Sequence, residues 1–179
     1  MTDDSELLSA LRAIQARGAI GEGSLEHAVA HADQFVAALP AAAQTLADLG
    51  AGGGLPGLVI AWRSPRLRIT LVERRATRAD LLLRAVHALG MAERVAVLAD
   101  DVRVLGERAP GSFDVVTARS FAAPPITARW AGVLLRTGGT LIVSEPPQED
   151  AQRWPVELLQ RCGLLDLGRE QGVRRFSRS

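Results

Sequence analysis

The sequence predicts an α/β protein built on a mostly parallel β-sheet with helices on both faces. Three observations support this fold class. Apolar, β-branched segments alternate with helical segments about every 25 residues, the pattern of β-α-β crossovers. A glycine-rich turn joins the first strand to the helix that follows it. The chain has 179 residues and 47% hydrophobic content, which suits one domain with a sizeable core.

Two helices are expected before the first strand. Residues 3–17 place Leu7, Leu11 and Ile14 at helical spacing. Ser24 is a favoured N-cap for a second helix that runs to about Leu39. We therefore expect a single domain over residues 1–179, with an N-terminal helical cap at 1–40 and the ligand-binding core at 41–179.

The core is expected to contain seven strands. They are predicted at 45–49, 67–72, 94–98, 113–118 and 140–144, with two more between 164 and 179 that are separated near Gly172. Helices are predicted at 58–62, 76–89, 124–136 and 148–162, with a short one after Asp101, and Gly138-Gly139 is expected to turn into the fifth strand. Sheets of this type bind ligands at the carboxyl ends of their strands, close to the point where the strand order reverses.

Composition excludes several classes of protein. The net charge is +1, all 21 basic residues are arginine, and tyrosine is absent. No apolar run reaches the roughly 18 residues of a membrane span, and the acidic N-terminus does not resemble a signal peptide. Cys162 is the only cysteine, so no internal disulfide is possible. We expect a cytoplasmic protein that has no membrane partner.

The segment 48–57, DLGAGGGLPG, is the strongest local motif. Its glycines Gly50, Gly52 and Gly54 follow a G-x-G-x-G pattern, and Leu55 stands where a dinucleotide fingerprint needs glycine. No G-K-[ST] is present, so a P-loop is excluded. A glycine turn preceded by an acid, here Asp48, is typical of the S-adenosylmethionine (SAM) loop of Rossmann-like methyltransferases. The alternative is an ordinary tight β–α turn.

Carboxylates at two further strand ends fit an adenosyl ligand. Glu73 closes the second strand, where it can accept hydrogen bonds from both ribose hydroxyls. The Glu73 carboxylate argues against a 2′-phosphate on the ligand, although Arg74 and Arg75 follow it and keep that alternative open. Asp100 or Asp101, with the backbone of Val102, is placed to contact the adenine amino group. The competing interpretations are an exposed charge at Glu73 and a helix N-cap at the aspartates.

The end of the fourth strand, residues 117–121, is where catalytic residues lie in this fold. Arg119 is the candidate there, because arginine can orient a phosphate or an acceptor base. The alternative is a rim arginine. Cys162 lies far from the strand ends, which argues against pyrimidine C5 methylation. We expect His27 and His31 to be partly exposed helix residues rather than metal ligands, and we expect no metal site.

Four segments together resemble one family. They are DLGAGGGLPGL, ITLVERRATRADLL, FDVVTARSFA and LLRTGGTLIV, and they span residues 48–143. The resemblance is to the GidB (glucose-inhibited division protein B) family of SAM-dependent guanine-N7 methyltransferases of small-subunit ribosomal RNA. It implies a Rossmann-like methyltransferase with SAM as cofactor and ribosomal RNA or the small ribosomal subunit as partner.

The resemblance also implies roles for individual residues. Arg119 would face the RNA as the catalytic residue. Gly50, Gly52, Gly54 and Glu73 would hold SAM, and the region of Asp101 and Val102 would hold adenine. With the residues argued from the motif and the strand ends, the expected cofactor-binding set is Asp48, Gly50, Ala51, Gly52, Gly54, Leu55, Glu73, Arg74, Asp100, Asp101 and Val102.

The chain departs from the family pattern at two places. Residues 144–147, Ser-Glu-Pro-Pro, stand where the family usually has a lysine-glycine pair. The H-x-x-D-S element before the loop is only approximated by His27, His31 and Asp33. Two alternatives to RNA methylation therefore stay open. One is a methyltransferase with a small-molecule or protein acceptor, and the other is a SAM-binding module without catalysis.

Overall fold

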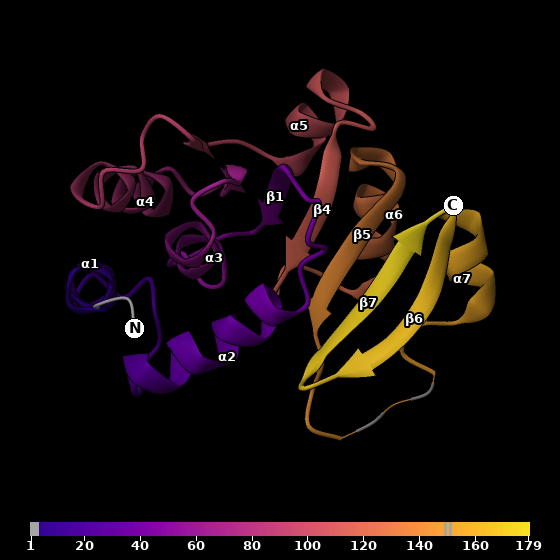
Figure 1. Ribbon diagram of the computed structural model, residues 1–179, viewed down its shortest axis with the longest axis horizontal. Coiled ribbons are helices and arrows are strands. Elements are labelled where there is room, and N and C mark those ends of the chain that lie inside the picture. The colour runs from indigo at the N-terminus through magenta and orange to yellow at the C-terminus, as the bar shows by residue number, and fades with distance from the viewer. Residues whose placement is uncertain (1–3, 149, 151) are drawn as a thin grey trace.

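A computed structural model describes residues 4–148, 150 and 152–179 of the chain, and these form a seven-stranded sheet with helices on both sides (Figure 1). The strands are β1 (Thr45–Leu49), β2 (Arg68–Val72), β3 (Val95–Leu98), β4 (Phe113–Ala118), β5 (Leu135–Ser144), β6 (Leu164–Glu170) and β7 (Val173–Arg178). The helices are α1 (Ser5–Gln15), α2 (Leu25–Ala37), α3 (Gly57–Arg63), α4 (Ala76–Ala88), α5 (Val102–Arg108), α6 (Pro124–Leu134) and α7 (Val156–Arg161).

The strand order is β3-β2-β1-β4-β5-β7-β6. The first five strands pair in parallel, and the β6–β7 hairpin adds to β5 in the antiparallel direction. The order reverses between β1 and β4, which are direct neighbours, so the carboxyl ends of these two strands flank the switch point. The predicted fold class is confirmed.

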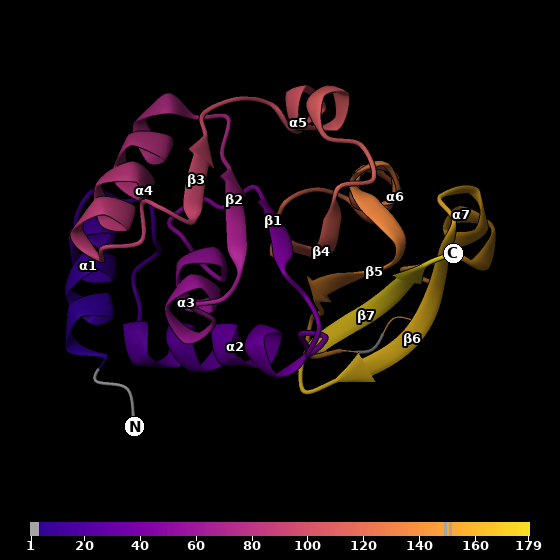
Figure 2. The same cartoon turned by 45° about the horizontal axis from the view of Figure 1, so that its top comes forward.

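Each face of the sheet carries its own hydrophobic core. The first contains Leu11 of α1, Phe35 of α2, Leu58 of α3 and Leu82 of α4, all fully buried. Figure 2 shows α1 alongside α4, and α2 passing beside α3. The second core contains residues from α5, α6 and α7, together with Phe176 of β7, which is fully buried. The apolar periodicity seen in the sequence thus buries one stripe of each helix against the sheet.

The N-terminal helices are fastened to the layer that carries the glycine loop. Arg63 at the end of α3 donates hydrogen bonds to Asp4, which precedes α1, and its Nε donates to Asp33 Oδ1 of α2 at 3.0 Å. A Cβ added to Gly53 would lie only 2.7 Å from the carbonyl oxygen of Ala19. The α1–α2 connection therefore lies directly against the glycine loop.

Two predicted boundaries are wrong. The fifth strand starts at Leu135, so α6 ends earlier than expected and Gly138-Gly139 lie inside β5. The register there jumps from the Phe113–Leu135 pair to the Val115–Thr140 pair. Glycine permits the positive φ of 76° that Gly138 adopts in this irregular stretch.

The last helix is also shorter than predicted. It starts at Val156, immediately after Pro155, which lies at the N-cap. Gln148, Asp150 and Gln152 are not helical, and residues 149 and 151 of the predicted range lie outside the described residues. Proline lacks a backbone N–H and is tolerated at a helix start but not in its interior, so Pro155 sets the boundary. No helix in the described ranges is long and apolar enough to cross a membrane.

Candidate active site

The glycine loop between β1 and α3 uses left-handed backbone at three positions. Gly50, Gly52 and Gly54 have φ values of 66°, 56° and 92°. These angles are costly for any residue with a Cβ, which accounts for the G-x-G-x-G spacing. The loop lies at the carboxyl end of β1, at the switch point of the sheet.

Asp48, at the end of β1, holds this loop through hydrogen bonds. Its Oδ2 accepts the N–H of Gly57 at 3.1 Å, and its Oδ1 accepts the hydroxyl of Thr117 on β4 at 2.7 Å. The side chain is buried, and burial raises the pKa of Asp48 to about 7. A Cβ on Gly57 would lie 2.5 Å from Asp48 Oδ2, so the LPG end of the motif gives the carboxylate access to the backbone.

Glu73 fastens the other side of the loop. Its Oε2 accepts the N–H of Gly52 at 3.0 Å, and its Oε1 accepts the N–H of Arg75 at 2.8 Å. The residue is only 6% exposed. A carboxylate oxygen has a second lone pair, so each oxygen can still accept a bond from a ligand hydroxyl. The alternative of an exposed strand-end charge is therefore wrong.

A first cavity of about 420 Å³, which we call the cofactor cavity, opens beside Glu73. It is lined by Gly50, Val72, Glu73, Arg74, Arg75, Arg78, Asp100, Asp101, Val102, Ser120, Phe121, Ala122, Ile126 and Trp130. Six of the predicted cofactor residues lie on its wall: Gly50, Glu73, Arg74, Asp100, Asp101 and Val102. The other five, Asp48, Ala51, Gly52, Gly54 and Leu55, do not line the cavity and belong to β1 and the loop beside it.

The structure shows the helix-cap role at Asp101 and places both aspartates on the wall of the cofactor cavity, whereas contact with adenine stays a prediction. Asp101 is the N-cap of α5, because its Oδ1 accepts the N–H of Arg103 at 2.9 Å. Asp100 Oδ1 accepts the N–H of Asp101 at 2.7 Å. Both are exposed and line the cofactor cavity, so the capping role does not remove them from the site.

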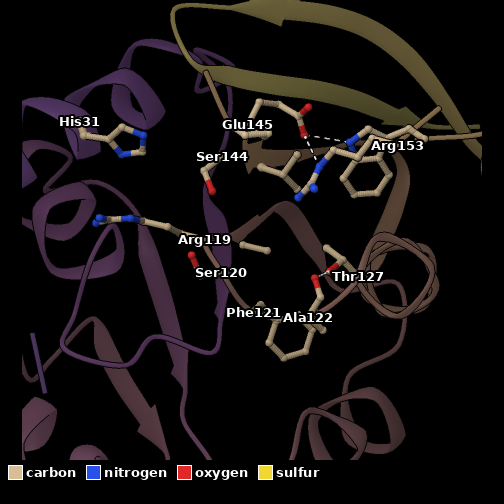
Figure 3. A pocket seen from close by; sticks show the side chains of 13 residues that line it. His31, Arg119, Ser120, Phe121, Ala122, Thr127, Ser144, Glu145 and Arg153 are labelled. Atoms are coloured by element: carbon tan, nitrogen blue, oxygen red, sulfur yellow. Dashed lines mark hydrogen bonds and ion pairs between the residues drawn. The ribbon is translucent and has the colours of Figure 1, made fainter. Parts of the chain in front are cut away.

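A second cavity of about 330 Å³, the acceptor cavity, lies over the carboxyl ends of β4 and β5 (Figure 3). It is lined by His31, Ala118, Arg119, Ser120, Phe121, Ala122, Thr127, Val143, Ser144, Glu145, Pro146, Arg153 and Trp154. Ser120, Phe121 and Ala122 line both cavities. The two spaces are therefore neighbours that share one stretch of wall.

The shared wall has an unusual backbone. Ser120 has φ of 53°, one of two non-glycine residues with positive φ in the described part of the chain. Such backbone costs about 1–3 kcal/mol and persists only where its surroundings enforce it. Phe121, the next residue, packs on the glycine loop, since a Cβ on Gly50 would lie 2.8 Å from its Cδ2.

Arg119 and His31 lie on the same side of the acceptor cavity in Figure 3. Both are partly buried, and burial lowers the pKa of each. The positive charge of Arg119 also lowers the pKa of His31, whereas the Asp48 carboxylate favours the charged guanidinium. Arg119 is thus a partly buried cation near Asp48 that lines the acceptor cavity, rather than an exposed arginine at the rim of the site. His27, by contrast, is exposed.

Several lining residues were not predicted from the sequence. The sequence contained a signal for His31, because it stands four residues before Phe35 and therefore on the same face of the helix. In the structure the two rings lie 6.0 Å apart. Arg153 and Trp154 carried no recognisable signal, because they come from an irregular segment before α7. Cys162 caps the end of α7 and lines neither cavity. Within the described ranges, no three His, Cys, Asp or Glu side chains cluster as metal ligands would.

The strand order, the glycine loop and the strand-end carboxylate together define the Rossmann-like methyltransferase fold. Cofactor-bound Rv0187 from MTB is similar over 98% of this chain and 90% of its own, with TM-score 0.67 and 20% identity. An O-methyltransferase family protein from Burkholderia thailandensis covers 84% of this chain and 57% of its own, with TM-score 0.67 and 19% identity. At these identities the likeness establishes the fold.

Sequence comparison then gives the family. The family model for rRNA small subunit methyltransferase G matches residues 24–152, and the chain belongs to this family. Ribosomal RNA small subunit methyltransferase G of Neisseria meningitidis serogroup C is 33% identical over 73% of this chain and 64% of the relative. Its counterpart in Mycobacterium sp. (strain KMS) is 32% identical over 68% and 54%, respectively. The chain spans roughly half to two thirds of the length of these two relatives.

Proposed function

We propose that this chain is a SAM-dependent methyltransferase that transfers a methyl group to guanine N7 of small-subunit ribosomal RNA. The observation that carries the proposal is the pair of adjoining cavities at the switch point of the sheet, one with three carboxylates beside the glycine loop and one that contains Arg119 and Arg153. Family membership supplies the RNA acceptor. This substrate would place the reaction in the cytoplasm.

The residues of the cofactor cavity fit SAM. Glu73 is held by two backbone N–H groups, so its remaining lone pairs could accept bonds from ribose hydroxyls without further ordering of the side chain. Asp100, Asp101 and the backbone of Val102 line the part of the wall that would meet adenine. The volume of about 420 Å³ is within the range of small-ligand pockets. When bound, SAM supplies an electrophilic methyl group on its sulfonium.

The protein's main contribution to the reaction would be alignment. Guanine N7 carries a lone pair and needs no deprotonation, so no general base is required. Holding two reactants in line can supply several kcal/mol of the barrier reduction. We propose that Arg119 orients the acceptor and that Phe121, at the wall between the cavities, gives the base an apolar surface to stack on.

The test is transfer of labelled methyl groups from SAM to small ribosomal subunits that lack the modification. Incorporation that maps to a guanine N7 supports the proposal, and Gly52→Val, which puts a side chain on left-handed loop backbone, should abolish it. Arg66→Ala, an exposed arginine that lines neither cavity, is the matched control. Transfer only to small molecules or protein would refute the RNA acceptor. Tight SAM binding without any transfer would refute catalysis.

A further inference from the structure

The wall of the acceptor cavity contains a buried acid. Glu145 follows β5 and is 9% exposed. Its Oε1 accepts the indole N–H of Trp154 at 2.9 Å and the Nε–H of Arg153 at 3.2 Å. Trp154 is itself buried and packs on Phe176, with ring centroids 4.8 Å apart. Glu145 is thus joined through Trp154 to the second core, and it holds one edge of the Arg153 guanidinium.

Among the residues that the structure describes, none bonds to the other edge of that guanidinium. Within the described residues, neither Nη atom of Arg153 makes a hydrogen bond to protein, and the side chain remains 33% exposed. Arginine has five N–H donors in a planar fork, and Glu145 takes only the one on Nε. Figure 3 shows Arg153 across the cavity from Arg119 and His31.

We propose that Arg153 binds a backbone phosphate of the RNA acceptor, and that Glu145 and Trp154 position it for this role. The inference rests on the proposed function, whose acceptor is RNA. A planar guanidinium fork suits phosphate oxygens, which it can contact with two parallel bonds. The phosphate fits the Arg153 side of the cavity because the apolar Phe121 belongs to the wall shared with the cofactor cavity, where the reacting base must lie.

The opposite charges of Glu145 and Arg153 allow the proposal to be distinguished from a general loss of structure. Glu145 and Arg153 form an ion pair, so together they contribute no net charge. Removing the Arg153 guanidinium would expose an unpaired carboxylate to the phosphate. Removing the Glu145 charge would leave an uncompensated cation in place. The two substitutions should therefore change RNA affinity in opposite directions, which simple damage to the fold would not do.

The experiment measures binding of a fluorescein-labelled, guanosine-containing single-stranded RNA to the full chain with S-adenosylhomocysteine present, across salt concentrations. Each phosphate contact to a single strand contributes about 0.7 to the slope of log Kobs against log[salt], which corresponds to about a fivefold change in affinity at 0.1 M salt. We expect Arg153→Ala to weaken binding at least fivefold and to reduce the slope by about 0.7. Glu145→Gln should strengthen binding.

Two further variants guard against misfolding. Arg153→Lys keeps the charge and should retain the wild-type slope while losing part of the affinity. Arg161→Ala removes one exposed charge from α7, outside the cavity, and should leave both affinity and slope unchanged.

An unchanged slope in Arg153→Ala, or no RNA binding by the wild type, would overturn the inference. Methyl transfer is measured separately on small subunits. If the slope changes as expected but no transfer occurs, the phosphate contact stands and the proposed reaction fails.

Discussion

The two cavities share a wall but are assembled in different ways. The cofactor cavity takes all its carboxylates from segments that directly follow β2 and β3, and backbone N–H groups bond to each of these carboxylates. Glu73, for example, bonds to Gly52 and Arg75. The acceptor cavity needs α2, the ends of β4 and β5, and the segment before α7. The fold alone determines where residues at strand ends lie. A site assembled from separate elements depends on the sequence of the particular chain.

Both cavities contain charged side chains of each sign, but the groups available to a ligand differ. Glu73, Asp100 and Asp101 face the cofactor side, where ribose hydroxyls and an adenine amino group would donate hydrogen bonds. Arg119 and Arg153 face the acceptor side, where phosphate and base oxygens would accept them. Asp48 lies beneath the junction and joins the glycine loop to β4.

The largest expected effect concerns Asp48 and the dependence of stability on pH. Its pKa rises from 3.8 to about 7 on folding, so the folded state binds an extra proton between these values. The contribution of Asp48 to the free energy of unfolding is fully present below about pH 4, and it is lost as the pH rises through 7. At 1.36 kcal/mol for each pKa unit, the difference in unfolding free energy between wild type and Asp48→Asn should change by about 4 kcal/mol over that window.

Urea denaturation at several pH values measures this difference. Asparagine can accept from Gly57 with its oxygen and donate to Thr117 with its amide, so the variant should fold. If the unfolding free energies of the two proteins changed in parallel with pH, Asp48 would be ionised across this range. The glycine loop would then be held by a buried charge.

The second effect separates the cavities by ligand. Glu73→Ala should weaken SAM binding by about ten- to a hundredfold, because a hydrogen bond to a charged group contributes roughly 1.5–3 kcal/mol. Calorimetry with SAM measures this change. Ser144→Ala on the acceptor side should leave SAM affinity as it is. Equal losses in both variants would mean that the cavities are not divided as proposed.

A third effect should leave both cavities untouched. Asp114, at the start of β4, accepts bonds from the Gln44 and Thr45 backbone and from Arg136, and these hold its pKa at about 2 despite partial burial. This stability is present above pH 3.8 and is lost as pH falls toward 2. Asp114→Asn should therefore cost about 2 kcal/mol at neutral pH, measured by urea denaturation. A loss of SAM affinity in the folded variant would contradict this assignment.

The smallest expected effect concerns Phe121, which belongs to the wall that both cavities share. Phe121 lines both, so Phe121→Ala should weaken SAM and RNA binding together, each by about 1 kcal/mol, the lower end for aromatic stacking. Calorimetry and fluorescence anisotropy measure the two affinities, and Phe121→Leu gives a control with similar apolar bulk. A change in only one affinity would assign Phe121 to a single cavity.

The sequence was sufficient for the fold and for the glycine loop and carboxylates of the cofactor side, because those features are local. Glycine spacing requires left-handed turns, and alternation of strands and helices puts Glu73 and Asp101 at one edge of the sheet. The β5 boundary and the acceptor cavity could not be found in this way. They depend on a register shift opposite Phe113 and on contacts such as Trp154 with Glu145, which only the folded sheet brings together.

The most direct test of the division into two cavities is a comparison of KM values for methyl transfer to small ribosomal subunits. Initial rates are measured against SAM concentration at saturating subunits, and against subunit concentration at saturating SAM. We expect Glu73→Ala to raise KM for SAM and to leave KM for subunits near the wild-type value, and we expect Arg153→Ala to do the reverse. If both variants raise the same KM, cofactor and acceptor do not occupy separate cavities.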